Sequence, residues 1–104
     1  METSPKKQPL CPVEKTLSII GKKYAPLIIR DLLTGKKRFG QLLLSISNIS
    51  PRTLSARLDE LERDGIVEKK IFPIVPPRVE YTLTKRGKQL HGILEQMSKW
   101  GLKK

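Results

Sequence analysis

The most informative stretch of the chain is residues 50–65, SPRTLSARLDELERDG, which predicts one amphipathic helix with a signal at each end. A serine hydroxyl such as that of Ser50 caps a free backbone N–H, and Pro51 at the first helical position loses no hydrogen bond. Gly65 supplies the left-handed residue that ends a helix. The leucines of the stretch fall on one narrow arc at about 100° per residue, so we expect them to face a core. They are Leu54, Leu58 and Leu61.

The outer face of this helix favours contact with duplex DNA. Its first two turns carry small or hydrogen-bonding side chains, whereas its acidic residues lie in the second half. The positive N-terminus can approach phosphates, and small side chains let the helix lie deep in the major groove. A helix with only a structural role has no need to separate its basic and acidic residues in this way. The alternative is that the outer face is simply solvated and contacts no DNA. The residues expected at the groove are Ser50, Pro51, Arg52, Thr53, Ser55, Ala56 and Arg57.

The neighbouring segments predict a helix-turn-helix with a wing. A short helix over residues 39–45 precedes Ser50 by a tight connection, and two strands, residues 67–72 and 78–83, follow as a hairpin. Prolines stiffen the hairpin loop without pairing in a ladder. The predicted fold class is mainly α with a small β-hairpin wing, a winged helix-turn-helix.

Further helices are expected at both ends of this unit. Apolar spacing becomes helical at Pro12 and stops at Gly21, and a second helix covers residues 24–33. Pro26 lies in its first turn, where the missing N–H costs little. A last helix is expected over residues 85–102.

The charge of the chain fits a polyanionic partner. The 104 residues carry 21 Lys and Arg but only 10 Asp and Glu, a formal net charge of +11. Half of the acidic residues fall within residues 59–68, which leaves the rest strongly basic. Counterion release drives such a surface onto phosphate, although charge alone also fits a merely soluble basic protein. We expect one domain at residues 11–104, with residues 1–10 as a flexible arm.

Several classes of protein are not favoured by the composition. One cysteine cannot form an internal disulfide, and we find neither a signal peptide nor an apolar run of about 18 residues, so a cytoplasmic, non-membrane protein is expected. The few aromatics favour a duplex over a single-strand binder. One His, one Cys and no Gly-rich phosphate loop give no basis for an enzyme, a metal site or a cofactor.

Five segments carry a more specific signal when they are taken in order. They are CPVEKTL at 11–17, KRFGQL at 37–42, ISPRTL at 49–54, LDELERDGIV at 58–67, and PPRVEYTLT at 76–84 followed by Gly87. Together they resemble the HxlR-type winged-helix regulators, relatives of the MarR group, over nearly all of residues 11–101. The chain departs from that pattern at residues 21–24, where GKKY replaces the frequent GGKW, and at the unusual Pro26.

The resemblance implies a homodimeric transcriptional regulator that binds operators of two-fold symmetry. Lys37 and Arg38 would hold phosphates, and the wing, with Arg78, would reach the backbone or the minor groove. Pairing of Arg78 with Glu80 inside the hairpin is an equally open alternative. Residues of the first and last helices would form the dimer seam, although the last helix could instead cover the protein's own core. The seam residues are Leu10, Val13, Leu17, Leu90, Ile93, Leu94, Met97 and Trp100.

Cys11 precedes Pro12 and is expected at a helix N-cap, where the helix dipole and nearby Lys15 favour the thiolate. The resemblance implies a sensor of oxidants or electrophiles at this position, and the alternative is an inert thiol at the dimer edge. The expected partners are double-stranded DNA, a second copy of the chain, and an oxidant or small-molecule effector. Two other functions stay open: a winged-helix protein-interaction module and a non-specific architectural DNA binder.

Overall fold

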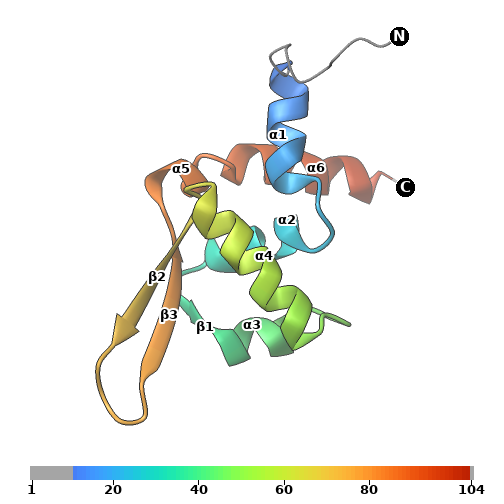
Figure 1. Cartoon of the computed structure of the whole chain (residues 1–104). Coiled ribbons are helices and arrows are strands. Elements are labelled where there is room, and N and C mark those ends of the chain that lie inside the picture. Colours follow the sequence, from blue (N-terminus) through green and yellow to red (C-terminus); the bar gives the residue numbers. More distant parts are fainter. Residues whose placement is uncertain (1–10, 104) are drawn as a thin grey trace, which may run out of the picture.

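The computed structural model describes residues 11–103, and Figure 1 shows how their helices and strands are arranged. The helix that follows Ser50 lies at the front of the molecule in this view, beside a small sheet, and the first and last helices lie above it. The elements are α1 (Pro12–Ile20), α2 (Ala25–Leu32), β1 (Lys37–Arg38), α3 (Phe39–Ser45), α4 (Pro51–Arg63), β2 (Val67–Phe72), β3 (Arg78–Leu83), α5 (Lys85–Lys88) and α6 (His91–Leu102).

The core forms where α4 packs against α2, α3 and the start of the sheet. The three α4 leucines are buried, as their spacing predicts. Each apolar side chain that leaves water here stabilises the fold by about 1.5–3 kcal/mol before entropy is counted. The largest fully buried side chains come from these same elements and are Ile28, Ile29, Leu42, Leu54, Leu58, Leu61, Ile66 and Val67.

The predicted helix-turn-helix is confirmed. Ser50 is the N-cap of α4, and Gly65 follows the helix with a φ of 75°, in the left-handed region that glycine tolerates. The turn between α3 and α4 contains Asn48, which also has a positive φ of 66°. Ile46 and Ile49 on either side are buried, so the turn is held down by its own apolar residues.

The wing belongs to a three-stranded antiparallel sheet in the order β1-β3-β2. The register pairs Phe72 with Arg78 at the far end of the hairpin and Val67 with Leu83 at its base. β1 pairs with β3 through Lys37 and Tyr81. Only the base of the hairpin is buried, and the hairpin projects away from the helices at its loop end (Figure 1).

The prediction of one continuous last helix is wrong. The segment is divided into α5 and α6 by a turn at Gln89 and Leu90. Gly87 is buried so closely on the sheet side that a Cβ there would lie 2.3 Å from the backbone oxygen of Ile66. The Thr84 hydroxyl also bonds the oxygen of Gly65 at 2.6 Å. These contacts hold α5 against the base of the sheet, and after the turn α6 packs on α2.

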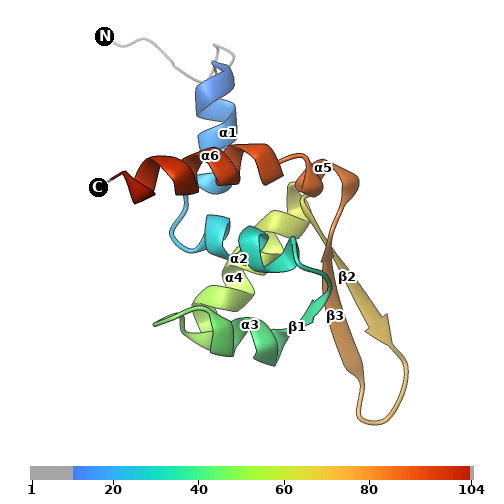
Figure 2. The ribbon, with the colours of Figure 1, turned by 180° about the vertical axis from the view of Figure 1, so that it is seen from behind.

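Helices α1 and α6 form the periphery of the molecule. Figures 1 and 2 show α1 projecting away from the sheet and α6 lying across the lower end of α1. None of the residues of α6 is buried, and Ile20 is the buried residue of α1. Among the described residues, no helix is both long enough and apolar enough to cross a membrane. The arm predicted at residues 1–10 lies outside the described residues, as does Leu10 of the expected seam.

Candidate nucleic-acid interface

The first turn of α4 is fixed by the hydroxyl of Ser50. The backbone N–H of Thr53 donates to Ser50 Oγ at 3.1 Å, and the Ser50 hydroxyl donates to Thr53 Oγ1 at 3.0 Å. Pro51 occupies the first turn, where its missing N–H breaks no helical bond. Thr53 is half-buried, so its side chain belongs to the cap more than to the outer surface.

The outer side of the first two α4 turns is exposed and carries no acidic residue. The acidic residues of the helix begin at Asp59. Free N–H groups at the helix start add partial positive charge to this surface, which suits a phosphate-bearing partner. We call this surface the α4 face, and its members are Pro51, Arg52, Ser55 and Ala56.

Arg57, which was predicted to contact DNA, is bonded to other residues of the chain. Its Nε donates to the backbone oxygen of Lys23 at 3.0 Å, and its Nη1 lies 3.1 Å from Glu60 Oε1. Only 23% of the side chain is exposed. The guanidinium is therefore engaged within the chain, and we leave Arg57 out of the proposed DNA-contacting surface.

The loop after α1 makes two further contacts that sequence reasoning missed. Lys22 Nζ lies 3.5 Å from Glu60 Oε2, and the Tyr24 hydroxyl donates to the backbone oxygen of Asn48 at 3.1 Å. Tyr24 itself has a left-handed φ of 76°, which is uncommon for a residue other than glycine. The loop is thus bonded to both the turn and α4. The only sequence signal was the departure at Lys22 and Tyr24 from the family pattern.

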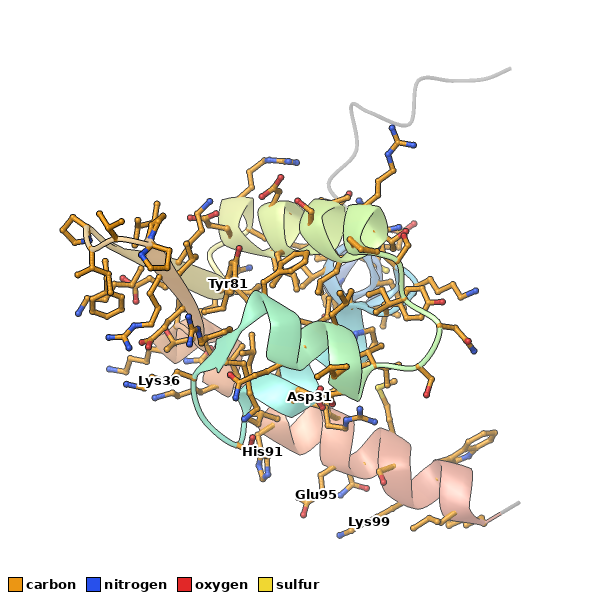
Figure 3. All side chains as sticks on the ribbon, turned by 90° about the horizontal axis from the view of Figure 1, so that it is seen from below. Asp31, Lys36, Tyr81, His91, Glu95 and Lys99 are labelled. Atoms are coloured by element: carbon orange, nitrogen blue, oxygen red, sulfur yellow. The ribbon has the colours of Figure 1, made fainter. Side chains whose placement is uncertain are left out.

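A second group of predicted contact residues lies on the sheet. Lys37 Nζ donates to Thr34 Oγ1 at 2.7 Å, which leaves further ammonium protons for a phosphate. Arg38 is exposed, and its backbone N–H donates to Gln41 Oε1 at 2.8 Å at the start of α3. Lys36, labelled beside the sheet in Figure 3, lies 3.7 Å from Glu80.

Arg78 is paired inside the hairpin, one of the two alternatives that its sequence left open. Its Nε lies 3.5 Å from Glu80 Oε2, and its guanidinium carbon lies 4.8 Å from the ring centre of Phe72. Lys70 Nζ lies 5.2 Å from the same ring. Cation–π contacts of this kind hold both positive groups along the stem of the wing.

Tyr81 lies on β3, within electrostatic range of the acidic half of α4. Burial raises the pKa of its phenol above the usual value, and the negative charges of Asp59 and Glu62 raise it further. The phenol therefore stays neutral over the physiological range. Within residues 11–103, no group of three or more His, Cys, Asp or Glu side chains is placed to hold a metal ion.

Comparison with known proteins decides the family. The sequence model of the family described as HxlR-like helix-turn-helix matches residues 19–104. The chain belongs to the HxlR-like helix-turn-helix family. The HTH-type transcriptional regulator YdeP of Bacillus subtilis strain 168 is 43% identical over 93 residues, which cover 89% of this chain and 73% of YdeP.

Two solved structures show the same fold. The redox regulator HypR in its oxidized form has a TM-score of 0.85 and 42% identity, covering 90% of this chain and 97% of HypR. The reduced form of the transcriptional regulator YodB from B. subtilis has a TM-score of 0.77 and 40% identity, covering 88% and 91%. HxlR-like proteins are DNA-binding transcriptional regulators and not enzymes, and the winged helix-turn-helix prediction is confirmed.

In this HxlR-like chain, Cys11 is the N-cap of α1, as its position before Pro12 predicts. Its Sγ accepts from the backbone N–H of Glu14 at 3.4 Å, and its own N–H donates to Glu14 Oε1 at 3.0 Å. The thiol is free and exposed. A soluble oxidant can therefore reach the sulfur.

The expected dimer seam divides into two parts in this structure. Leu90 and Leu94 are half-buried and pack against the core of their own chain. The other seam residues that the structure describes are exposed, up to 68% for Trp100. An open groove between α1 and the α5–α6 segment adjoins them, with Thr16, Ile19, Leu90 and Ile93 among its walls. The exposed apolar members are Val13, Leu17, Ile93, Met97 and Trp100.

Proposed function

We propose that this chain is a sequence-specific regulator that places the α4 face in the major groove of duplex DNA. The observation that carries the proposal is the sorting of charge along α4, with Arg52 and small residues exposed before Asp59. An arginine can bond guanine edges with two donors, and Ser55 and Ala56 leave room for close approach. The mechanism of regulation is steric, because an occupied operator blocks or repositions polymerase. The protein would act in the cytoplasm.

The regulator is proposed to act as a homodimer through α1 and α6. The exposed apolar side chains of α1 and α6 favour this, because exposed apolar residues that gather on one side mark an interaction surface. They are Val13, Leu17, Ile93, Met97 and Trp100. A two-fold dimer would present two α4 helices to two half-sites about 34 Å apart, one turn of DNA. Light scattering should give the dimer mass at micromolar concentration, and a Met97→Glu variant should shift it to the monomer.

Cys11 is proposed to make DNA binding sensitive to oxidants. The HypR and YodB comparisons support this, together with an exposed thiol beside the dimer surface. In the proposed step, the Cys11 thiols of two subunits form one disulfide, and diamide takes up the two electrons and two protons that the thiols lose. A small-molecule effector in the dimer cleft is the second candidate for release. In either case the angle between the two winged units would change.

Selection of bound sequences from a pool of random duplexes tests the proposal. A recovered palindrome with half-sites about 34 Å apart is expected with the native chain, and Arg52→Ala should lose preference at defined positions. Equal affinity for all sequences would instead favour a non-specific architectural binder. A lack of salt-dependent binding to duplex DNA would favour a protein-interaction module.

A further inference from the structure

A groove between α2 and α6 takes no part in the contacts described so far. Its volume is about 580 Å³, within the roughly 300–1,000 Å³ that is usual for small-molecule sites. Figures 1 and 2 both show α6 passing above α2, on which it packs. The walls of the groove are largely apolar, and they include Pro26, Leu27, Leu33 and Leu94.

Pro26 is one of the positions at which the chain departs from the family pattern. It lies in the first turn of α2, where its missing N–H breaks no helical bond, and it lines the groove. Leu27 beside it is 37% exposed and also lines the groove. The first turn of α2 therefore presents apolar surface to the groove at a residue that is unusual for the family.

Two charged side chains line the groove from opposite helices, and one of them is already paired. Arg30 of α2 donates from Nε and Nη2 to Asp31 Oδ1, at 3.2 and 3.1 Å. Glu95 of α6 makes no ion pair in the described part of the chain. Lys99, one turn further along α6 in Figure 3, neither pairs with Glu95 nor lines the groove. Glu95 is thus the lining charge, among the described residues, that is available to a ligand.

An anion is the less favourable ligand for this groove. To bond Arg30 it would have to displace Asp31, which also accepts a hydrogen bond from the Ser45 hydroxyl. Only 11% of the Asp31 side chain is exposed, so its carboxylate would lose a charged partner where water replaces that partner poorly. The same anion would also lie in a groove that Glu95 lines.

A second copy of the chain is also disfavoured as the occupant. Of the exposed apolar side chains expected at the dimer seam, Met97 is the described member that lines the groove. Arg30 and Glu95 line it as well, and charged residues are depleted from the buried centre of protein interfaces. A small molecule can instead fill the apolar part and leave these charges partly in water.

We propose that the groove binds a small organic cation, an amine carried on an apolar ring system. Its ammonium group would pair with Glu95, and its rings would lie between Leu27 and Leu94. The apolar walls supply most of the affinity, and the exposed carboxylate selects the charge of the ligand. This site lies within one chain and not in the dimer cleft, and the inference does not depend on DNA binding.

Titration of the native chain with three probes that share one ring system tests the proposal. Naphthylmethylamine carries the ammonium group, naphthylmethanol is neutral, and naphthoate is anionic. The backbone amide resonances of α2 and α6 follow binding at the groove. The amine should bind about fivefold more tightly than the alcohol, which is what one solvent-exposed ion pair contributes at most, and naphthoate should bind most weakly.

Three variants separate the carboxylate from the apolar walls. Glu95→Gln should remove the preference for the amine over the alcohol and leave the affinity for the alcohol unchanged. Glu68→Gln is the matched control and should keep the preference, because Glu68 is an exposed glutamate on β2, away from the groove. Leu27→Ser should weaken the binding of all three probes. Thermal unfolding confirms that each variant is folded.

Two results would overturn the proposal. One is a preference for the amine that persists in Glu95→Gln, or that is absent from the native chain. The other is a failure of every probe to bind the native chain, which is expected if a second copy fills the groove. No measurement in this series uses DNA, so its failure leaves the proposed function standing, and a failure of sequence-specific binding leaves the groove proposal standing.

Discussion

The Nε of Arg57 donates a hydrogen bond to the backbone oxygen of Lys23 over 3.0 Å, and so connects the middle of α4 to the loop after α1. The same guanidinium meets Glu60, which also lies 3.5 Å from Lys22. The helix proposed to enter DNA is thereby bonded to the segment that leads from Cys11 and the exposed side of α1.

Arg52→Ala and Arg57→Ala should change different properties, specific DNA binding in the first variant and stability in the second. Arg57→Ala removes a partly buried charged hydrogen bond and should lower the free energy of unfolding by about 1–3 kcal/mol, with the base preference kept. Arg52→Ala should change stability by less than about 0.5 kcal/mol and weaken specific binding by about 1–3 kcal/mol. Urea unfolding and anisotropy on selected duplexes measure the two quantities. A loss of base preference in Arg57→Ala alone would contradict the assignment.

Lys37→Ala should weaken binding to all duplex sequences alike. A lysine that neutralises one phosphate contributes about one unit, per chain, to the slope of log affinity against log salt, so the slope should fall by that amount. Titrations at several salt concentrations provide the measurement. Lys99→Ala is the control, because Lys99 lies on α6, away from Lys36 and the sheet in Figure 3. An equal fall in both variants would remove Lys37 from the interface.

Cys11→Ser should abolish the response to diamide without weakening the fold. Serine is a preferred N-cap residue, so its hydroxyl can accept the Glu14 N–H that the sulfur now accepts. Release of a selected duplex before and after diamide is the measurement, with binding before oxidation as the internal control. Oxidant-driven release that persists in Cys11→Ser would rule out the sensor role.

Tyr81→Phe should reduce the loss of stability at alkaline pH. The pKa of Tyr81 is raised in the folded state by burial and then by Asp59 and Glu62. Above the usual tyrosine pKa of about 10 the unfolded chain loses this proton first, so folding stability falls as pH rises toward the folded pKa. Urea unfolding between about pH 8 and about pH 11 compares the two chains. A stability difference that stays constant across this range would show that Tyr81 does not titrate differently on folding.

Much of the fold could be predicted because its signals are local. The cap at Ser50, the proline beside it and the glycine at position 65 act within one or two turns, and the leucine spacing sets the buried side of α4. The hairpin was found in the same way, from strand patterns on either side of a proline-rich loop. Those features need no knowledge of distant parts of the chain.

Other features depend on residues that are far apart in sequence. Arg57 meets a backbone oxygen 34 positions away, so its spacing on α4 alone placed it wrongly among outward side chains. The packing of Gly87 against the backbone of Ile66, in the short helix before the break, is likewise a contact that no helical periodicity reveals.

By itself the sequence determined which helix presents a basic, small-residue face and where that helix begins and ends. Only the tertiary structure decided which side chains on that face are free to contact DNA. The guanidinium of Arg57 is not free, because it lies within reach of a backbone oxygen and a carboxylate and bonds to both. It also decided that Arg78 pairs with Glu80 and that Ile74 and Val75 in the hairpin loop are exposed. Short-range hydrogen bonds and periodicity are encoded locally, whereas partners and burial exist only after distant segments meet.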